Sequence, residues 1–98
     1  MTIAQLRTYT INKGQLENWL EIFHSEVVPK LEDAGIKVES TWVNQEKSQF
    51  IWIRSFGHSY DDVRTKELEF YSSNWWKSNV ERLRSHIAHR EVVQIETT

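Results

Sequence analysis

Residues 49–56 read Gln-Phe-Ile-Trp-Ile-Arg-Ser-Phe, with apolar or aromatic side chains on both alternating faces. In a strand these side chains divide between two faces, one with Phe50, Trp52, Arg54 and Phe56 and the other with Ile51, Ile53 and Ser55. The β-branched and aromatic residues make this the strongest strand signal in the chain. A strand buried on both faces needs a layer on each side, and the helices of so short a chain can supply only one. We therefore expect a central strand, with a second copy of the chain as the other layer.

Residues 3–11 also alternate and predict a second strand. After it, apolar residues recur at three- and four-residue steps, which predicts an amphipathic helix that ends at Gly35. Pro29 lies inside this helix and has no amide hydrogen to donate, so we expect a kink or a second helical segment there.

The second half of the chain predicts two more strands and a helical region. Residues 36–43 alternate with one polar face, which is typical of an edge strand, and a short polar loop joins them to the central strand. Ser59 and Asp62 form a capping-box pattern at the start of a helix. Small polar residues at 72–74 predict a break in this helical region, and residues 90–96 alternate again as a fourth strand.

The predicted order is β-α-β-β-α-β, the ferredoxin-like α+β unit in which two helices cover one face of a four-stranded antiparallel sheet. The other face is left open. Burial of apolar area at about 25 cal/mol per Å² favours a homodimer through this open sheet face, with the two sheets forming an α/β barrel. In this interpretation Ile51 and Ile53 lie against the helices, while Trp52 and Arg54 lie between the two sheets.

Composition limits the classes of protein that the chain can represent. Its 98 residues predict a single domain, and its net charge of -2 argues against nucleic acid as a partner. It has no cysteine and no apolar run of the roughly 20 residues that span a membrane, so a cytoplasmic protein is expected. Five Trp residues are more than a core of this size needs, which indicates a cavity or an interface lined with aromatic rings.

Several short patterns occur along the chain in one order and at consistent spacing. They are Leu6, Arg7 and Tyr9, then Pro29, then Trp52, Arg54 and Phe56, then Phe70, Tyr71, Ser73 and Trp76, or Phe70, Tyr71, Ser72 and Trp75. With these patterns the chain resembles the NIPSNAP-like family of the dimeric α/β barrel superfamily over nearly its whole length. Gln5 stands where that family usually has Glu, and a neutral amide cannot act as a carboxylate base.

The resemblance implies a fold and a dimer, and little chemistry. The wider superfamily includes cofactor-free monooxygenases, small isomerases and haem-degrading enzymes. No cofactor is expected for this chain.

Four residues make the best candidate ligand site, because strand alternation places them on the open sheet face and inside the barrel: Arg7, Tyr9, Trp52 and Arg54. Guanidinium groups beside aromatic rings suit a planar or carboxylate-bearing ligand. The alternative is that the arginines pair with Glu39 or Glu91 while the aromatic rings only fill the barrel.

Two further residues are weaker candidates for the same site. His24 lies at the flank of the first helix, where it borders the pocket or is half exposed, and Trp75 packs under the Phe70 helix or at the pocket mouth. His86 and His89 have a spacing that a metal could use, but no third ligand is near in sequence, so no metal site is expected. Serine-nucleophile and phosphate-binding glycine patterns are absent from the sequence, which argues against hydrolases and nucleotide enzymes.

These observations predict a homodimeric small-molecule-binding α/β barrel protein of undefined biochemical role. The competing class is a cofactor-free monooxygenase or isomerase that acts on an aromatic or carboxylate-bearing small molecule. A third class is a purely structural interaction module.

Overall fold

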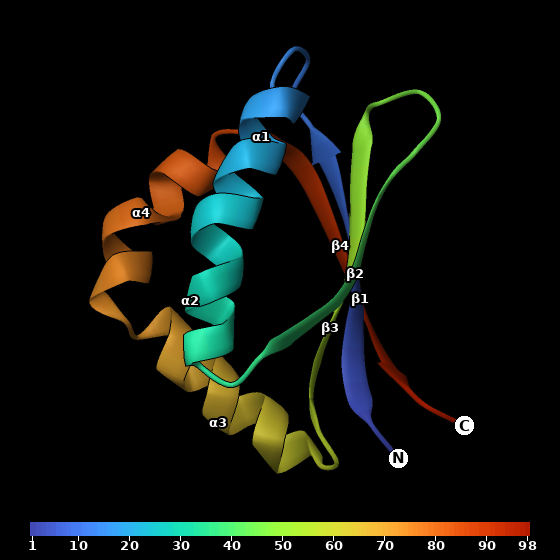
Figure 1. Ribbon diagram of the computed structural model, residues 1–98, viewed down its shortest axis with the longest axis vertical. Coiled ribbons are helices and arrows are strands. Elements are labelled where there is room, and N and C mark those ends of the chain that lie inside the picture. The colour runs from blue at the N-terminus through green and yellow to red at the C-terminus, as the bar shows by residue number, and fades with distance from the viewer.

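The computed structural model describes residues 1–98 and has the predicted order of elements. These are β1 (Ile3–Ile11), α1 (Leu16–Ile22), η1 (Phe23–Val27), α2 (Val28–Asp33), β2 (Lys37–Val43), β3 (Gln49–Gly57), α3 (Tyr60–Tyr71), α4 (Asn74–Arg84) and β4 (Ile87–Glu96). The strands form one antiparallel sheet in the order β2-β3-β1-β4, and all helices lie on one of its faces (Figure 1). The ferredoxin-like fold is therefore confirmed, with β3 central and β2 at an edge.

The two faces of β3 are the reverse of the prediction. Trp52 and Arg54 are buried under the helices, whereas Ile51 and Ile53 lie on the uncovered face and are partly exposed. The helix layer supplies large rings of its own, and Phe23 lies with its ring centroid 4.8 Å from that of Trp52. The aromatic set of β3 is therefore the set that fills the space between sheet and helices. The placement of Trp52 and Arg54 between two sheets was wrong.

The predicted second helical segment at Pro29 is present. Between Phe23 and Val27 the helix widens into the π-helical segment η1, and the amide of Val28 donates to the carbonyl of Phe23. Pro29 then lies in the first turn of α2, directly after this wide turn. Leu31 is still buried beyond it, so the apolar row continues across the π turn.

A capping box begins α3, as the sequence predicted. The Ser59 hydroxyl accepts from the amide of Asp62, and the Asp62 carboxylate accepts from the amides of Ser59 and His58. The pKa of Asp62 is lowered, chiefly by the hydrogen bond from His58. This cap fixes the start of the helix that brings Glu67 and Tyr71 over the sheet.

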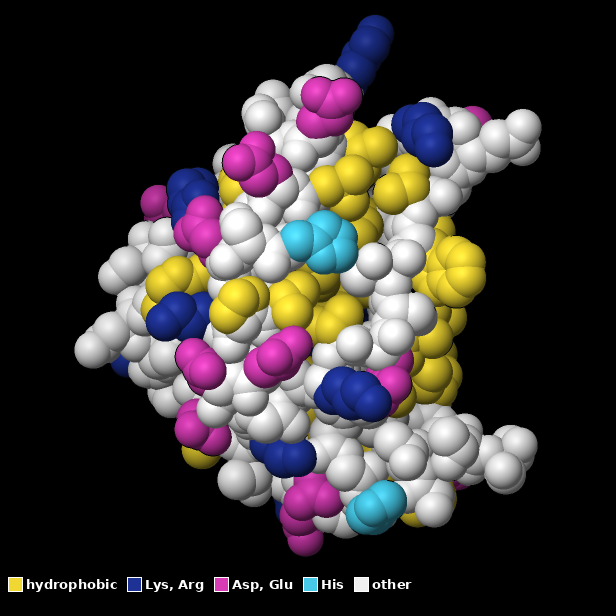
Figure 2. Space-filling model, in the orientation of Figure 1, with side chains coloured by type: hydrophobic (Ala, Val, Ile, Leu, Met, Phe, Trp, Pro, Cys, Tyr) yellow, Lys and Arg dark blue, Asp and Glu magenta, His cyan; other side chains and the backbone are white.

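Part of the uncovered face of the sheet is apolar. Trp42 is 63% exposed and stands opposite Ile51 in the register of β2 and β3, so it lies on this face. Val93 is 52% exposed and pairs with Leu6, which places both side chains beside Ile53. Figure 2 shows hydrophobic side chains along this side of the molecule.

No helix in the chain is both long and apolar enough to cross a membrane.

Candidate functional site

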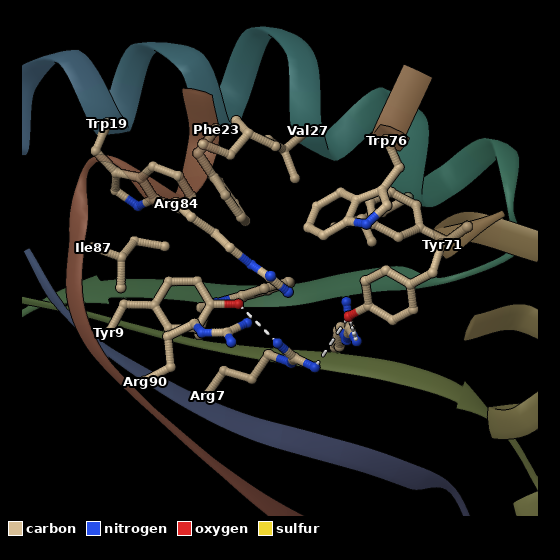
Figure 3. Close-up of a pocket in the computed structure, with 15 residues that line it drawn as sticks. Arg7, Tyr9, Trp19, Phe23, Val27, Tyr71, Trp76, Arg84, Ile87 and Arg90 are labelled. Carbon is tan, nitrogen blue, oxygen red and sulfur yellow. Dashed lines mark hydrogen bonds between the residues drawn. The ribbon is translucent and has the colours of Figure 1, made fainter. Parts of the chain in front are cut away.

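A hollow lies between the sheet and the helix layer, and aromatic and arginine side chains line it (Figure 3). Its free volume is about 40 Å³, within a space of about 450 Å³ that includes the mouth open to solvent. The sheet contributes Arg7, Tyr9, Trp52 and Arg54 to its lining. The four residues share one face of the sheet, but it is the helix-covered face and not the open face that the sequence predicted. Their role as a ligand site stays a prediction.

Gln5 holds the two buried arginines together. Its side-chain oxygen Oε1 accepts a hydrogen bond from Nε of Arg7 and another from Nε of Arg54, each at 3.0 Å. All three side chains are buried. Because an amide oxygen carries no charge, Gln5 orients the two guanidinium groups without neutralising either of them.

Two tyrosines and one carboxylate complete this network. Nη1 of Arg7 donates to the hydroxyl of Tyr9 at 2.8 Å, and Nη2 of Arg54 donates to the hydroxyl of Tyr71 at 2.9 Å. Nη2 of Arg54 also donates to Oε2 of Glu67 at 2.6 Å, and that oxygen lies 3.8 Å from Nη2 of Arg7. Each phenol oxygen therefore accepts from an arginine and keeps its own hydrogen to donate.

Arg7 keeps its charge although it is buried. Burial lowers the pKa of Arg7, but Tyr9, Tyr71 and Glu67 raise it, and the result lies above the ordinary value. Glu67 is the one carboxylate within ion-pair distance of Arg7 or Arg54, so two guanidinium groups share a single negative charge.

The expected alternative partners of the arginines lie elsewhere. Glu39 accepts from the hydroxyl of Ser55 and pairs with Lys37, and Glu91 lies beside His89. Glu91 lies opposite Thr8, which lies opposite Ile51, and Glu39 bonds to Ser55 two residues from Ile53, so both carboxylates belong to the uncovered face. The alternative in which Glu39 or Glu91 pairs with the arginines is therefore wrong.

The aromatic part of the hollow contains two unpaired hydrogen-bond donors. The indole nitrogens of Trp19 and Trp52 are both buried and have no hydrogen-bond partner. Trp52 also lies under the arginines, with its ring centroid 5.9 Å from Cζ of Arg7 and 5.6 Å from Cζ of Arg54. A buried donor without a partner is costly, so these nitrogens favour a ligand that carries an acceptor.

The two weaker candidates, His24 and Trp75, do not border this hollow. His24 is exposed, with its ring edge-on to Phe23 at 5.4 Å. Trp75 is partly buried against Phe70 and borders a separate surface hollow beside Lys30.

His86 and His89 lie in different environments. His86 is buried, and its Nδ1 lies 2.9 Å from the carbonyl oxygen of Arg82, while the side chain of His89 is exposed beside Glu91. No group of three or more His, Cys, Asp or Glu side chains is arranged to hold a metal ion.

The sequence patterns did not identify several residues of the site. They are Gln5, Trp19, Glu67, Tyr71, Trp76, Arg84 and Arg90. Tyr71 and Trp76 belong to the later family-like pattern, so that pattern was the available signal for them. Nothing local in the sequence distinguishes Arg84 from a solvent-facing helix charge, or Arg90 from an edge-strand charge.

No protein-family model and no curated protein matches the sequence. Solved structures do match. A NIPSNAP family protein from Agrobacterium tumefaciens is 19% identical, with a TM-score of 0.89 over 100% of this chain and 94% of that one. A NIPSNAP domain protein from Burkholderia xenovorans is 15% identical, with a TM-score of 0.87 over 98% of this chain and 94% of that one.

A cofactor-independent oxygenase, SnoaB from Streptomyces nogalater, is 10% identical, with a TM-score of 0.74 over 98% of this chain and 92% of that one. At these identities the similarity concerns the fold. The chain has the fold of NIPSNAP family structures, and antibiotic biosynthesis monooxygenase structures share its ferredoxin-like arrangement.

Proposed function

We propose that the chain is a homodimeric small-molecule-binding α/β barrel protein whose ligand lies between the sheet and the helices of one copy. The unpaired indole N–H groups of Trp19 and Trp52, beside the arginine network, carry this proposal. They are buried donors that nothing within the chain satisfies, and Tyr9 and Tyr71 each have a hydroxyl hydrogen to add. A cytoplasmic location stays a prediction.

Removal of one phenol should weaken binding and leave the fold intact. We expect the Tyr71→Phe variant to bind small aromatic compounds such as benzamide and benzoate about tenfold more weakly, because one donor to the ligand is lost. Quenching of tryptophan fluorescence measures the affinity, since Trp19, Trp52 and Trp76 line the hollow. Tyr60→Phe changes an exposed tyrosine and is the matched control. Absence of binding by the wild-type protein at millimolar probe concentration would contradict the proposal.

The uncovered sheet face supports the homodimer. Its apolar side chains include Trp42, Ile53 and Val93, and burial of such area against a second copy favours association. In this proposal the dimer contacts come from these residues, and Trp52 and Arg54 are left for the ligand.

A single charge on this face should separate the copies. We expect the wild-type protein to have the mass of a dimer in light scattering at micromolar concentration, and Ile53→Lys to have the mass of a monomer, since desolvation of a charge in an apolar interface is costly. Leu68→Lys, on the exposed side of α3, is the control and should remain dimeric. A monomeric wild-type protein would rule out the proposed dimer.

The alternative function is a cofactor-free monooxygenase or isomerase that acts on an aromatic or carboxylate-bearing molecule. Its support is the shared fold with a cofactor-independent oxygenase, together with a cationic arginine that donates to the hydroxyl of Tyr9. Such a pair can stabilise negative charge that develops on a substrate oxygen. Oxygen uptake with a panel of hydroquinones separates this class from simple binding. An interaction module without a ligand would show neither uptake nor fluorescence quenching.

A further inference from the structure

Four guanidinium groups border the hollow, and only one carboxylate offsets them. Arg7 and Arg54 share Glu67, while Arg84 and Arg90 form no ion pair with any acidic side chain. The net charge of the whole chain is -2, so this positive surplus is a local feature of the site. Like charges that converge in a partly desolvated space repel one another, and a bound anion removes that cost.

The unpaired arginines converge on the buried pair from two different elements. Arg84 comes from the end of α4 and Arg90 from β4, and Figure 3 shows both guanidinium groups directed toward that of Arg7. Arg84 also lies over the ring of Trp76, with its Cζ 5.7 Å from the centroid. This contact holds the charge over the aromatic lining at the mouth of the hollow.

A second hollow adjoins the first at these arginines. It is open and mostly polar, and Arg7, Arg84 and Arg90 line both spaces. The guanidinium groups therefore stand at the boundary between an outer polar space and an inner aromatic one. A ligand that spans the boundary meets positive charge at one end and rings at the other.

The geometry points to a small planar organic anion as the ligand. Its carboxylate lies at Arg84 and Arg90, its flat body lies among Phe23, Trp52 and Trp76, and an oxygen at its far end accepts from the unpaired indole nitrogens. This assignment rests on the proposed function, because it names the ligand class of the same pocket. The inner free volume of about 40 Å³ holds the equivalent of a few water molecules. A single ring therefore enters only as the long side chain of Arg84 moves outward from the position it occupies in Figure 3.

The test compares anions with neutral molecules of the same shape. Benzoate and 4-hydroxybenzoate are titrated against benzamide and 4-hydroxybenzamide, with tryptophan fluorescence and calorimetry as readouts. We expect each anion to bind at least about tenfold more tightly than its amide, because guanidinium–carboxylate hydrogen bonds are charge-assisted. Added salt should weaken binding of the anions and leave the amides unchanged.

Variants at the mouth assign the charge recognition to particular residues. Arg84→Gln and Arg90→Gln should each weaken benzoate binding about tenfold and leave benzamide binding unchanged. Both residues are exposed, so the variants should fold, and circular dichroism checks this. Arg64→Gln removes the same charge from the exposed side of α3 and should have no effect.

The outcomes separate this inference from the proposed function. Equal affinity for anions and amides, unaffected by Arg84→Gln and Arg90→Gln, would overturn the anion assignment while pocket binding stands. Binding by neither series would overturn both.

Discussion

The Glu67→Gln variant should lose about 2–3 kcal/mol of the free energy of unfolding. Glu67 is the one carboxylate that offsets the buried guanidinium groups of Arg7 and Arg54, and its Oε2 lies 2.6 Å from Nη2 of Arg54. A neutral amide at this position would leave both charges without a counter-charge in a partly desolvated site. Urea unfolding measures the loss as a lower midpoint at an unchanged slope.

A second substitution should reverse this loss. Gln5→Glu puts a carboxylate of the same shape between the two Nε donors, so the double variant Gln5→Glu, Glu67→Gln should recover most of the lost stability. Gln5→Glu alone should also weaken benzoate binding, because it removes part of the positive surplus. Glu69→Gln changes an exposed glutamate of α3 and is the control. A Glu67→Gln variant as stable as that control would mean that the ion pair of Glu67 with the buried arginines contributes nothing to stability.

The Phe23→Ala variant should lose about 3–5 kcal/mol of the free energy of unfolding, a large share of the total for a domain of this size. Phe23 is fully buried, and its ring centroid lies 4.7 Å from that of Phe50 and 4.8 Å from that of Trp52. Removal of this ring takes out the contact through which η1 packs on the sheet and leaves a cavity that the rigid strands cannot close.

Thermal and urea unfolding check the Phe23→Ala result. Leu68→Ala removes an apolar side chain that is 70% exposed, and it should change stability by less than about 0.5 kcal/mol. A Phe23→Ala variant that unfolds at the same urea concentration as Leu68→Ala would show that the aromatic cluster does not hold the helix layer.

Local patterns predicted most of the fold. Alternation gave the strands, Pro29 marked the second helical segment, and Ser59 with Asp62 marked the start of α3. Alternation also divides a strand into two sets of side chains, but it does not say which set meets the helices. Arg54 belongs to the buried set, and the partners that permit its burial come from other segments of the chain, Gln5 and Glu67.

The sequence predicted only part of the candidate site, because residues from distant segments of the chain complete it. Arg7 and Trp52 lie opposite one another on β1 and β3, and alternation along each strand assigned them to one face. Arg84 and Arg90 reach the site only because α4 crosses the sheet beside β4, which is a property of the packed layers. Gln5 was set aside because it lacks charge, although its neutral oxygen is what brings two cations together.

The π-helical segment η1 also bears on which changes of chain length the helix layer tolerates. The hydrogen bond from the Val28 amide to the Phe23 carbonyl is a π-helical bond, and it encloses one residue more than an α-helical hydrogen bond does. If one residue between them were deleted, ordinary helical turns could replace the wide one, and Leu31 would still face the sheet. The same deletion within α1 or α2 would turn every residue beyond it by about 100° and carry part of the buried row into solvent. A one-residue gap in this helix among proteins of the same fold is therefore expected at residues 23–27.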